Sequence, residues 1–245
     1  MFIDAVSYFL AGLCLYTIKK PEGAPISKNS KLNLANEITI GVKFVFGNRC
    51  INALMGESAT YNLFSQILMS VFLLHCANEL HLSAGMIGLI FSMGGIGSII
   101  GSLLAEKVSK RTGIGPATIW SMILACGVLV LVPIAEEFPD NMIGFIFTGF
   151  FLNGIGLSLS NITATSIRQS VIPEYMLARA LSASRLITWG ATPIGALTGG
   201  LLGEMIGLRE TMFIGGIGLF LAPLWVIFSP LRKMKGTILR IRISF

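Results

Sequence analysis

Residues 84–105 read AGMIGLIFSMGGIGSIIGSLLA, a run of 22 residues without a charged side chain. A helix needs about 20 predominantly apolar residues to cross the hydrocarbon core of a bilayer. The whole chain has this character, because 53% of its 245 residues are hydrophobic and only 12% are charged. Soluble domains carry about 25% charged residues. The predicted fold class is therefore all-α, a polytopic bundle of transmembrane helices.

Seven predominantly apolar runs predict about seven spans. Their approximate limits are 1–18, 51–77, 84–105, 115–135, 141–166, 181–206 and 211–229. A transmembrane β-barrel would show shorter segments of alternating polarity, whereas these runs are long and rich in Gly, Leu and Ile. The first run has no basic segment before it and no clear cleavage site, so we interpret it as a span whose beginning is missing rather than as a signal peptide.

The basic residues are distributed unevenly over the connections between the predicted spans. When the connections are taken alternately, 17 of the 18 Lys and Arg residues fall on one side, and Arg209 is the exception. Basic residues that flank spans mark the cytoplasmic side. The pattern predicts a multi-pass membrane protein with its C-terminus in the cytoplasm. It also accounts for the net charge of +6 without a nucleic-acid partner.

Two polar segments flank the six later spans. Residues 19–50 are predicted to form a cytoplasmic linker followed by an amphipathic helix, because Ile38, Val42 and Val45 recur at helical spacing. Two interpretations of this helix stay open: an interfacial helix that lies in the membrane surface, or a cytoplasmic cap on the bundle. Residues 230–245 are predicted to form a cytoplasmic tail.

Glu57 is the first candidate functional residue, because ionisable groups inside the hydrocarbon are costly and tend to be functional. Ser58, Tyr61, Asn62 and Ser65 recur at intervals of three and four residues and make a polar stripe beside it. In one interpretation this stripe lines a cavity in which Glu57 carries protons or holds a cationic substrate. In the other, Glu57 reaches water near the cytoplasmic end or pairs with Arg49.

A second polar stripe lies in the fifth predicted span. Asn153, Gly156, Ser160 and Thr163 share one helical face, and small or hydroxylated residues favour close helix packing in membranes. Packing is the simpler interpretation, and Asn153 and Ser160 remain substrate candidates. Gly195, Gly199, Gly203 and Gly207, like Gly97, Gly101 and Ala105, repeat every four residues and predict tight helix crossings. Pro193 and Pro223 predict kinks.

The sequence does not indicate an enzyme. His75 and His81 are the only histidines and lack the spacing of a zinc site. The chain has no GxSxG elbow and no Walker loop, and its four cysteines are widely spaced. We therefore predict no catalytic residues, no metal and no cofactor, and energy for any transport would come from an ion gradient.

Two segments carry a family resemblance. Residues 168–209, RQSVIPEYMLARALSASRLITWGATPIGALTGGLLGEMIGLR, resemble the connection between spans ten and eleven of the major facilitator superfamily. Residues 88–113, GLIFSMGGIGSIIGSLLAEKVSKRTG, are similar to its span eight and the basic loop that follows, although Glu106 stands where the family has Asp. The resemblance is to the bacterial drug and siderophore exporters, which include macrolide efflux proteins and the enterobactin exporter.

The resemblance implies a place for each part of the chain. Residues 1–18 look like the end of span six and residues 51–229 like spans seven to twelve, which is about half of a transporter. Such a half would need an N-terminal six-span half, because the substrate site lies between the two halves. Glu106, Arg111 and Arg185 correspond to charges that gate the conformational switch, although a plain solvated role is equally open.

The resemblance also implies a function. We expect the C-terminal half of a secondary-active transporter in the bacterial inner membrane, which exports an amphipathic drug, macrolide or siderophore in exchange for protons. The alternative is a truncated or split product that does not transport by itself and serves as a membrane-embedded assembly partner. A seven-span enzyme or receptor is disfavoured, since no catalytic set is present.

Overall fold

The computed structural model describes residues 2–17 and 34–234, and every regular element within them is a helix. The predicted fold class is confirmed. The chain divides into two compact units, Met1–Leu34 and Ala35–Phe245. The first unit contains α1 (Phe2–Tyr16). Residues 19–33 of the predicted segment 19–50 lie outside the described residues. Residues 235–245, most of the predicted tail, also lie outside them.

The second unit is a bundle of long helices joined by short connections. Its elements are α2 (Leu34–Gly47), α3 (Arg49–Asn78), α4 (Ala84–Thr112), α5 (Ile114–Leu129), α6 (Leu131–Ile134), η1 (Ala135–Glu137), η2 (Pro139–Asn141), α7 (Met142–Val171), α8 (Glu174–Ile206), α9 (Leu208–Leu219), α10 (Leu221–Ile227) and η3 (Pro230–Lys233).

Five helical segments of the described chain are long and apolar enough to cross a membrane. They are Arg49–Asn78, Ala84–Thr112, Ile114–Ile134, Met142–Val171 and Leu208–Ile227, so α5 with α6 and α9 with α10 each make one span. α8 is longer still, at 33 residues, but its glycines, serines and threonines lower its hydropathy. The apolar stretch of α1, Ala5–Cys14, is shorter than a full span. Five of the seven predicted spans thus meet both criteria.

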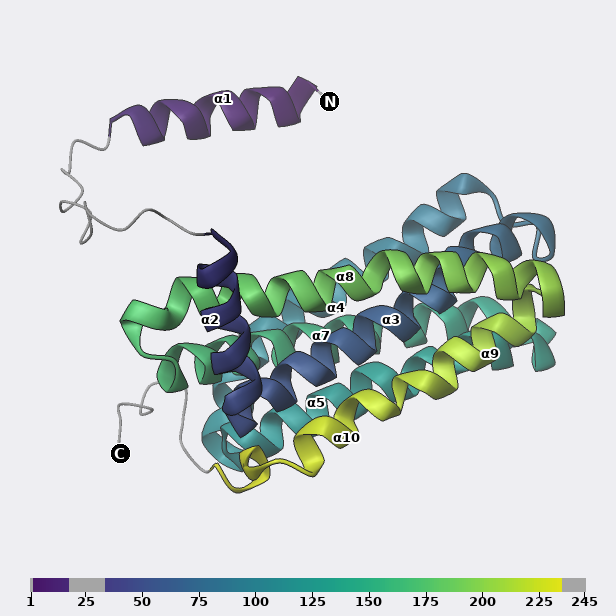
Figure 1. Cartoon of the computed structure of the whole chain (residues 1–245). Helices are drawn as coiled ribbons and strands as arrows, with labels where there is room; N and C mark the ends of the chain where they lie inside the picture. The colour runs from purple at the N-terminus through teal and green to yellow at the C-terminus, as the bar shows by residue number, and fades with distance from the viewer. Residues whose placement is uncertain (1, 18–33, 235–245) are drawn as a thin grey trace. The chain divides into compact units, whose positions relative to one another are not determined.

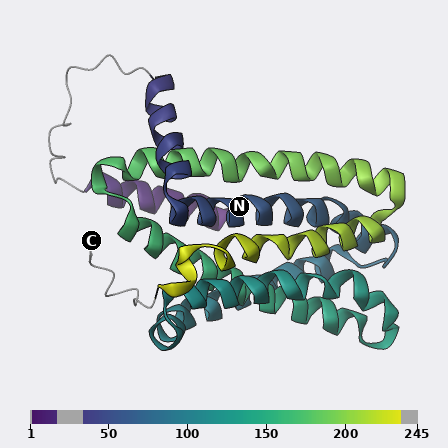
Figure 2. The same cartoon turned by 60° about the horizontal axis from the view of Figure 1, so that its bottom comes forward.

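The long helices form an internal repeat, in which a group of three helical segments occurs twice. α3 packs mainly on α8 and α9, and α7 packs in the same way on α4 and α5. The unit α3–α4–α5/α6 is thus repeated by α7–α8–α9/α10, with the first helix of each unit packed against the second and third helices of the other (Figures 1 and 2). Each group has three long segments, and each segment runs back along the one before it, so α7 runs antiparallel to α3 (Figure 1).

Two glycines occupy equivalent positions in this repeat. Gly113 joins α4 to α5 with φ of 89°, and Gly207 joins α8 to α9 with φ of 103°. Residues with a side chain rarely adopt this conformation, since Cβ then meets the backbone. Each glycine lets one long helix end and the next begin after a single residue.

Two prolines shape the third helix of each unit. α5 ends at Leu129, four residues before Pro133, and α9 ends at Leu219, four residues before Pro223. A proline ring clashes with the carbonyl four residues earlier and supplies no N–H for it, which explains both breaks. α8, in contrast, continues through Pro193, where the sequence predicted a kink.

The glycine repeats lie where helices approach most closely. A Cβ added at Gly101 on α4 would overlap the backbone of Ile155 on α7, and one added at Gly199 on α8 would overlap the backbone of Ile67 on α3. The predicted tight crossings are therefore present in both units. Because the backbones touch, these interfaces leave no room for a larger side chain.

α2 packs with one face against the bundle. Val45 is fully buried in a cluster with Ile51 and Met176, and Glu37 forms an ion pair with Arg179 of α8. The side chain of Phe46, on another face, is 55% exposed. One face of α2 thus packs on the bundle, and both interpretations of this helix remain predictions.

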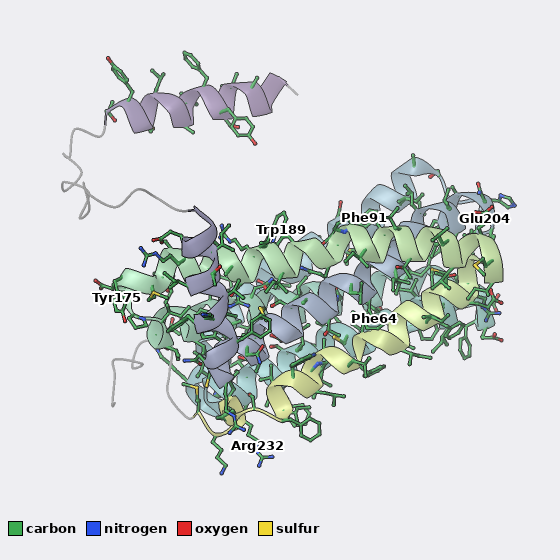
Figure 3. All side chains as sticks on the ribbon, in the orientation of Figure 1. Phe64, Phe91, Tyr175, Trp189, Glu204 and Arg232 are labelled. Atoms are coloured by element: carbon green, nitrogen blue, oxygen red, sulfur yellow. The ribbon has the colours of Figure 1, made fainter. Side chains whose placement is uncertain are left out.

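The two ends of the bundle differ in charge. Figure 3 shows Tyr175 and Arg232 at one end and Glu204 at the other. The first end also contains α2, the start of α3 and the last turns of α4 and α7. The basic residues described there are Lys43, Arg49, Lys107, Lys110, Arg111, Arg168, Arg179, Arg185, Arg232 and Lys233. At the opposite end Arg209 forms an ion pair with Glu137. We call the first end the basic end.

Candidate functional site

Glu57 of α3 is a carboxyl group inside the bundle, only 2% exposed. Asn48 caps the start of α3, and its side chain accepts hydrogen bonds from the N–H groups of Cys50 and Ile51 at 3.0 and 3.2 Å. This cap satisfies N–H groups that a helix start leaves unpaired. Glu57 lies eight residues after Arg49, about 12 Å along the helix at 1.5 Å per residue. A carboxyl group buried at this depth requires polar partners.

The partners come from α7. Ser160, 4% exposed, donates a hydrogen bond from its hydroxyl to Oε1 of Glu57 at 3.2 Å. The guanidinium of Arg168, two turns further along α7, interacts electrostatically with Glu57. Because α7 runs antiparallel to α3, its last turns meet the first turns of α3, which brings the guanidinium of Arg168 to the residues beside Glu57.

Arg168 also holds the two helices together at the basic end. Its Nη2 donates to the hydroxyl of Ser58 at 3.1 Å and to the carbonyl oxygen of Leu54 at 3.3 Å. Its Nε is buried and has no hydrogen-bond partner among the described residues. Guanidinium groups carry five N–H donors, so this donor is unused in the conformation seen here.

A polar cleft of about 670 Å³ opens beside this pair, between α3, α7 and α8. Its wall includes Ser58, Asn62 and Ser65 of α3, Asn161, Thr165 and Arg168 of α7, and Arg185, Thr188 and Trp189 of α8. Cavities of roughly 300–1,000 Å³ are the usual size for small-molecule sites. Arg168 both lines the cleft and interacts with Glu57, so it links the buried carboxyl to the accessible space.

The predicted stripe on α3 divides between two faces. Asn62 and Ser65 line the cleft, and the Asn62 side chain donates to the carbonyl oxygen of Thr188 on α8 at 2.7 Å. Tyr61 is buried on another face, where its hydroxyl accepts a hydrogen bond from Asn153 at 3.2 Å. The stripe therefore contributes both to the cleft and to the packing of α3.

The stripe on α7 serves mainly to pack against α5. Asn153 donates to the carbonyl oxygen of Ala125 at 2.8 Å, and the hydroxyls of Thr118 and Thr163 are 2.8 Å apart. Ser160 differs from these residues, since it reaches Glu57 on α3. Neither Asn153 nor Ser160 is part of the cleft wall.

Comparison with known proteins assigns the family. The model of the major facilitator superfamily matches residues 54–242. This chain belongs to the major facilitator superfamily. It is thus a member of a family of membrane transporters and not of enzymes, as the sequence predicted. The finer resemblance to the drug and siderophore exporters concerns a branch that the family match does not distinguish.

A solved structure agrees with the family at the level of the fold. The chain is similar to a bacterial homologue of the iron transporter ferroportin, crystallised in an outward-facing state, with a TM-score of 0.66 and 19% sequence identity. The alignment covers 90% of this chain and 52% of that one, so the chain spans about half the length of that transporter. No curated protein sequence matches this chain.

The three predicted gating charges do not gather at one point in this superfamily half. Glu106 forms an ion pair with Lys110 on its own helix, α4. Arg111 is exposed on the last turn of α4, whereas Arg185 lines the polar cleft. Among the described residues, no ion pair joins Glu106 to either arginine.

Arg168 is the functional candidate that the sequence analysis missed. The predicted span 141–166 stops two residues before Arg168 and so places this residue in a loop. α7 in fact continues to Val171 and ends before Ile172 and Pro173. A residue before proline avoids helical conformation. Pro173 was therefore the available signal that the helix extends past Arg168.

Proposed function

We propose that this superfamily half forms part of a secondary-active transporter that couples the export of an amphipathic small molecule to proton entry through Glu57. The observation that carries the proposal is the buried carboxyl of Glu57, held by Ser160 and facing the charge of Arg168. Ionisable groups inside membrane bundles are characteristic of proton relays in transporters.

The arrangement supports a simple coupling scheme. While Arg168 lies near Glu57, the positive charge stabilises the ionised carboxyl. If α7 and α3 shift so that Arg168 moves away from Glu57, the buried carboxyl is left without its counter-charge and takes up a proton instead. The protonation of Glu57 and the position of α7 are then linked, as alternating access requires.

The cleft supports an amphipathic cargo. Its wall combines hydroxyl and amide groups with the exposed ring of Trp189, and two arginines give it positive charge. Amide and hydroxyl groups can bind the polar part of a drug, macrolide or siderophore, and the indole can contact its apolar part. The related structure is that of an iron-transporter homologue. No group of three or more His, Cys, Asp or Glu side chains gathers in the described ranges, so a free metal cargo would need ligands from outside them.

The alternative function is a membrane-embedded assembly partner with no transport of its own. The share of the related transporter that is covered, 52%, favours it, because substrate sites in this architecture lie between two halves. The two proposals separate on reconstitution: the chain alone should be inactive in both, and only the first predicts Glu57-dependent transport once a six-span N-terminal half is present.

We further propose the bacterial cytoplasmic membrane as the location, with the basic end and the C-terminus in the cytoplasm. The supporting observation is the collection of basic residues at one end of the bundle; at the other end, Arg209 is the one Lys or Arg among the residues that the structure describes. Cysteine accessibility at the exposed positions Thr112, at the basic end, and Asp140, at the opposite end, can check the orientation in whole cells.

The test of coupling compares two changes of Glu to Gln. The gene region upstream of Met1 is read for the remaining spans, and the chain is expressed together with them. Ethidium and erythromycin serve as probes of efflux driven by a proton gradient, with an uncoupler as reference. Glu57→Gln should abolish this efflux while membrane insertion is intact, because the glutamine cannot ionise.

The control is Glu204→Gln, the same atomic change at an exposed position on α8. It should leave efflux and insertion unchanged. Normal uncoupler-sensitive efflux by the Glu57→Gln protein would exclude the proposed role of Glu57. Absence of any efflux from the complete wild-type assembly would favour the assembly partner.

A further inference from the structure

We propose that a second, basic cleft beside α10 binds the headgroup of an anionic phospholipid. This cleft has a volume of about 820 Å³ and lies between the start of α3 and the segment α10–η3. Three cations line it, Arg49, Arg232 and Lys233, and no acidic side chain occurs among the described residues of its wall. Clusters of Lys and Arg at the ends of spans attract the phosphate of anionic lipids.

The three cations are held in place by anchored backbone. Arg49 follows the capping residue Asn48 at the start of α3. On η3, Leu231 is fully buried and its N–H donates to the hydroxyl of Ser229 at 3.2 Å. The N–H of Gly115 donates to the carbonyl oxygen of Met234 at 3.2 Å. These contacts fix η3 against α5, so Arg232 and Lys233 are presented together rather than on a free tail.

An apolar stripe continues from the cations along α10. Its members follow the spacing i, i+3, i+4 and i+7 and are 48%, 40%, 47% and 82% exposed: Leu221, Leu224, Trp225 and Phe228. The indole of Trp225 lies against Gly56, and its Nε1 donates to the hydroxyl of Thr60 at 3.0 Å. Trp commonly lies at the boundary between headgroups and hydrocarbon.

The combination of the two surfaces identifies the ligand class. Three cations alone would fit any phosphate, whether free or attached to a lipid. An exposed apolar stripe that begins at the same cleft fits acyl chains, which free phosphate lacks. The basic residues of the cleft also lie at the end of the span Leu208–Ile227, where lipid headgroups are found. We therefore assign the cleft to a phospholipid with a net negative headgroup.

This cleft is separate from the polar cleft of the proposed transport site. Gly56 and Thr60 of α3 face Trp225, whereas Ser58 and Asn62 face the polar cleft on another side of the same helix. The lipid proposal thus does not depend on the transport proposal. An experiment can therefore contradict one of these proposals and leave the other intact.

The test uses the full chain, purified in detergent and mixed with equal amounts of phosphatidylglycerol and phosphatidylcholine, with bound lipid measured by native mass spectrometry. The chain should retain phosphatidylglycerol in preference. The triple variant Arg49→Gln, Arg232→Gln, Lys233→Gln should lower retained phosphatidylglycerol at least about tenfold, because each cation near an anionic headgroup contributes to binding.

The matched control removes three charges from the same end but outside the cleft: Lys107→Gln, Lys110→Gln, Arg111→Gln. It should change retention by less than about twofold, since long-range attraction is screened over about a Debye length. Equal losses in the two triple variants would overturn the site, and so would equal retention of the two lipids by the unaltered chain.

Two further measurements separate lipid from free phosphate. Phe228→Ser should weaken retention of phosphatidylglycerol, since it shortens the apolar stripe. Added inorganic phosphate should not displace the lipid; full displacement would assign the cleft to free phosphate and overturn the lipid proposal. Melting curves check that both triple variants are folded. If the triple variant of the cleft is not folded, the single change Arg232→Gln, at an exposed position, replaces it in the comparison with the unaltered chain.

Discussion

α7 meets two neighbours in opposite ways. Against α4 its backbone is in direct contact through Gly101, along much of both helices. Against α3 the contact is more limited and at the basic end consists of the polar groups Glu57, Ser160 and Arg168. At the other end Phe72 of α3 lies 5.1 Å from Phe150 of α7, centroid to centroid.

The difference suggests which interface can move. Two backbones packed together have one arrangement, and any shift opens voids along the whole contact. A contact made by a few long polar side chains can exchange partners instead, because the cleft beside it supplies space and alternative acceptors. We infer that α4 and α7 move as one body and that α3 and α7 shift relative to each other.

The largest expected effect comes from removing the counter-charge. Arg168→Met should lower the free energy of unfolding by about 3 kcal/mol, since it removes two hydrogen bonds from the guanidinium to α3 and also the positive charge that interacts with Glu57. Adding Glu57→Gln should recover part of this loss, because the buried carboxylate that Arg168 stabilised is then gone. Thermal or denaturant unfolding of the purified chain in micelles gives the free energies of the original chain, the two single variants and the double variant, which together make a double-mutant cycle. Losses that simply add would show that the two residues are not coupled.

A smaller loss is expected at the tight interface. Gly101→Leu forces a side chain into the backbone of Ile155 and should lower the free energy of unfolding by about 2 kcal/mol. The matched control is Gly95→Leu, on the same helix, where a Cβ meets nothing within 4 Å. The control should be neutral or stabilising, because leucine favours helix over glycine. Equal melting temperatures for the two variants would contradict the proposed packing.

The smallest effect concerns a single hydrogen bond between α3 and α7. Ser160→Ala removes the donor to Glu57 and should lower the free energy of unfolding by about 1 kcal/mol. Ser102→Ala is the control, since its exposed hydroxyl bonds only to its own helix. A Ser160→Ala protein as stable as the control would indicate that this hydrogen bond contributes nothing to the interface.

The sequence located the helices better than it located their ends. The predicted spans 84–105 and 141–166 correspond to the helices Ala84–Thr112 and Met142–Val171, which extend seven and five residues further. Span prediction follows hydropathy, which falls at the first charges. A helix instead continues while its backbone hydrogen bonds can form. The charged last turns were therefore assigned to loops, and Arg168 was lost as a site residue for that reason.

Other features depend on contacts that one sequence does not show. Tyr61 and Asn62 are adjacent in the chain, yet one faces the interior and the other the cleft, because the neighbours of α3 decide which polar face is covered. The internal repeat was also missed. It is carried by equivalent backbone features, such as Gly113 and Gly207, rather than by similar side chains.

The chain contains three tryptophans, and the contacts described above place them in separate environments. Trp189 lines the polar cleft, Trp225 lies against Gly56 at the basic cleft, and Trp120 of α5 is 67% exposed. With Trp120 and one other replaced by Phe, the remaining indole becomes an intrinsic fluorescent reporter. Emission from Trp189 would follow cargo and emission from Trp225 would follow lipid, so the two clefts can be observed independently in one unlabelled protein.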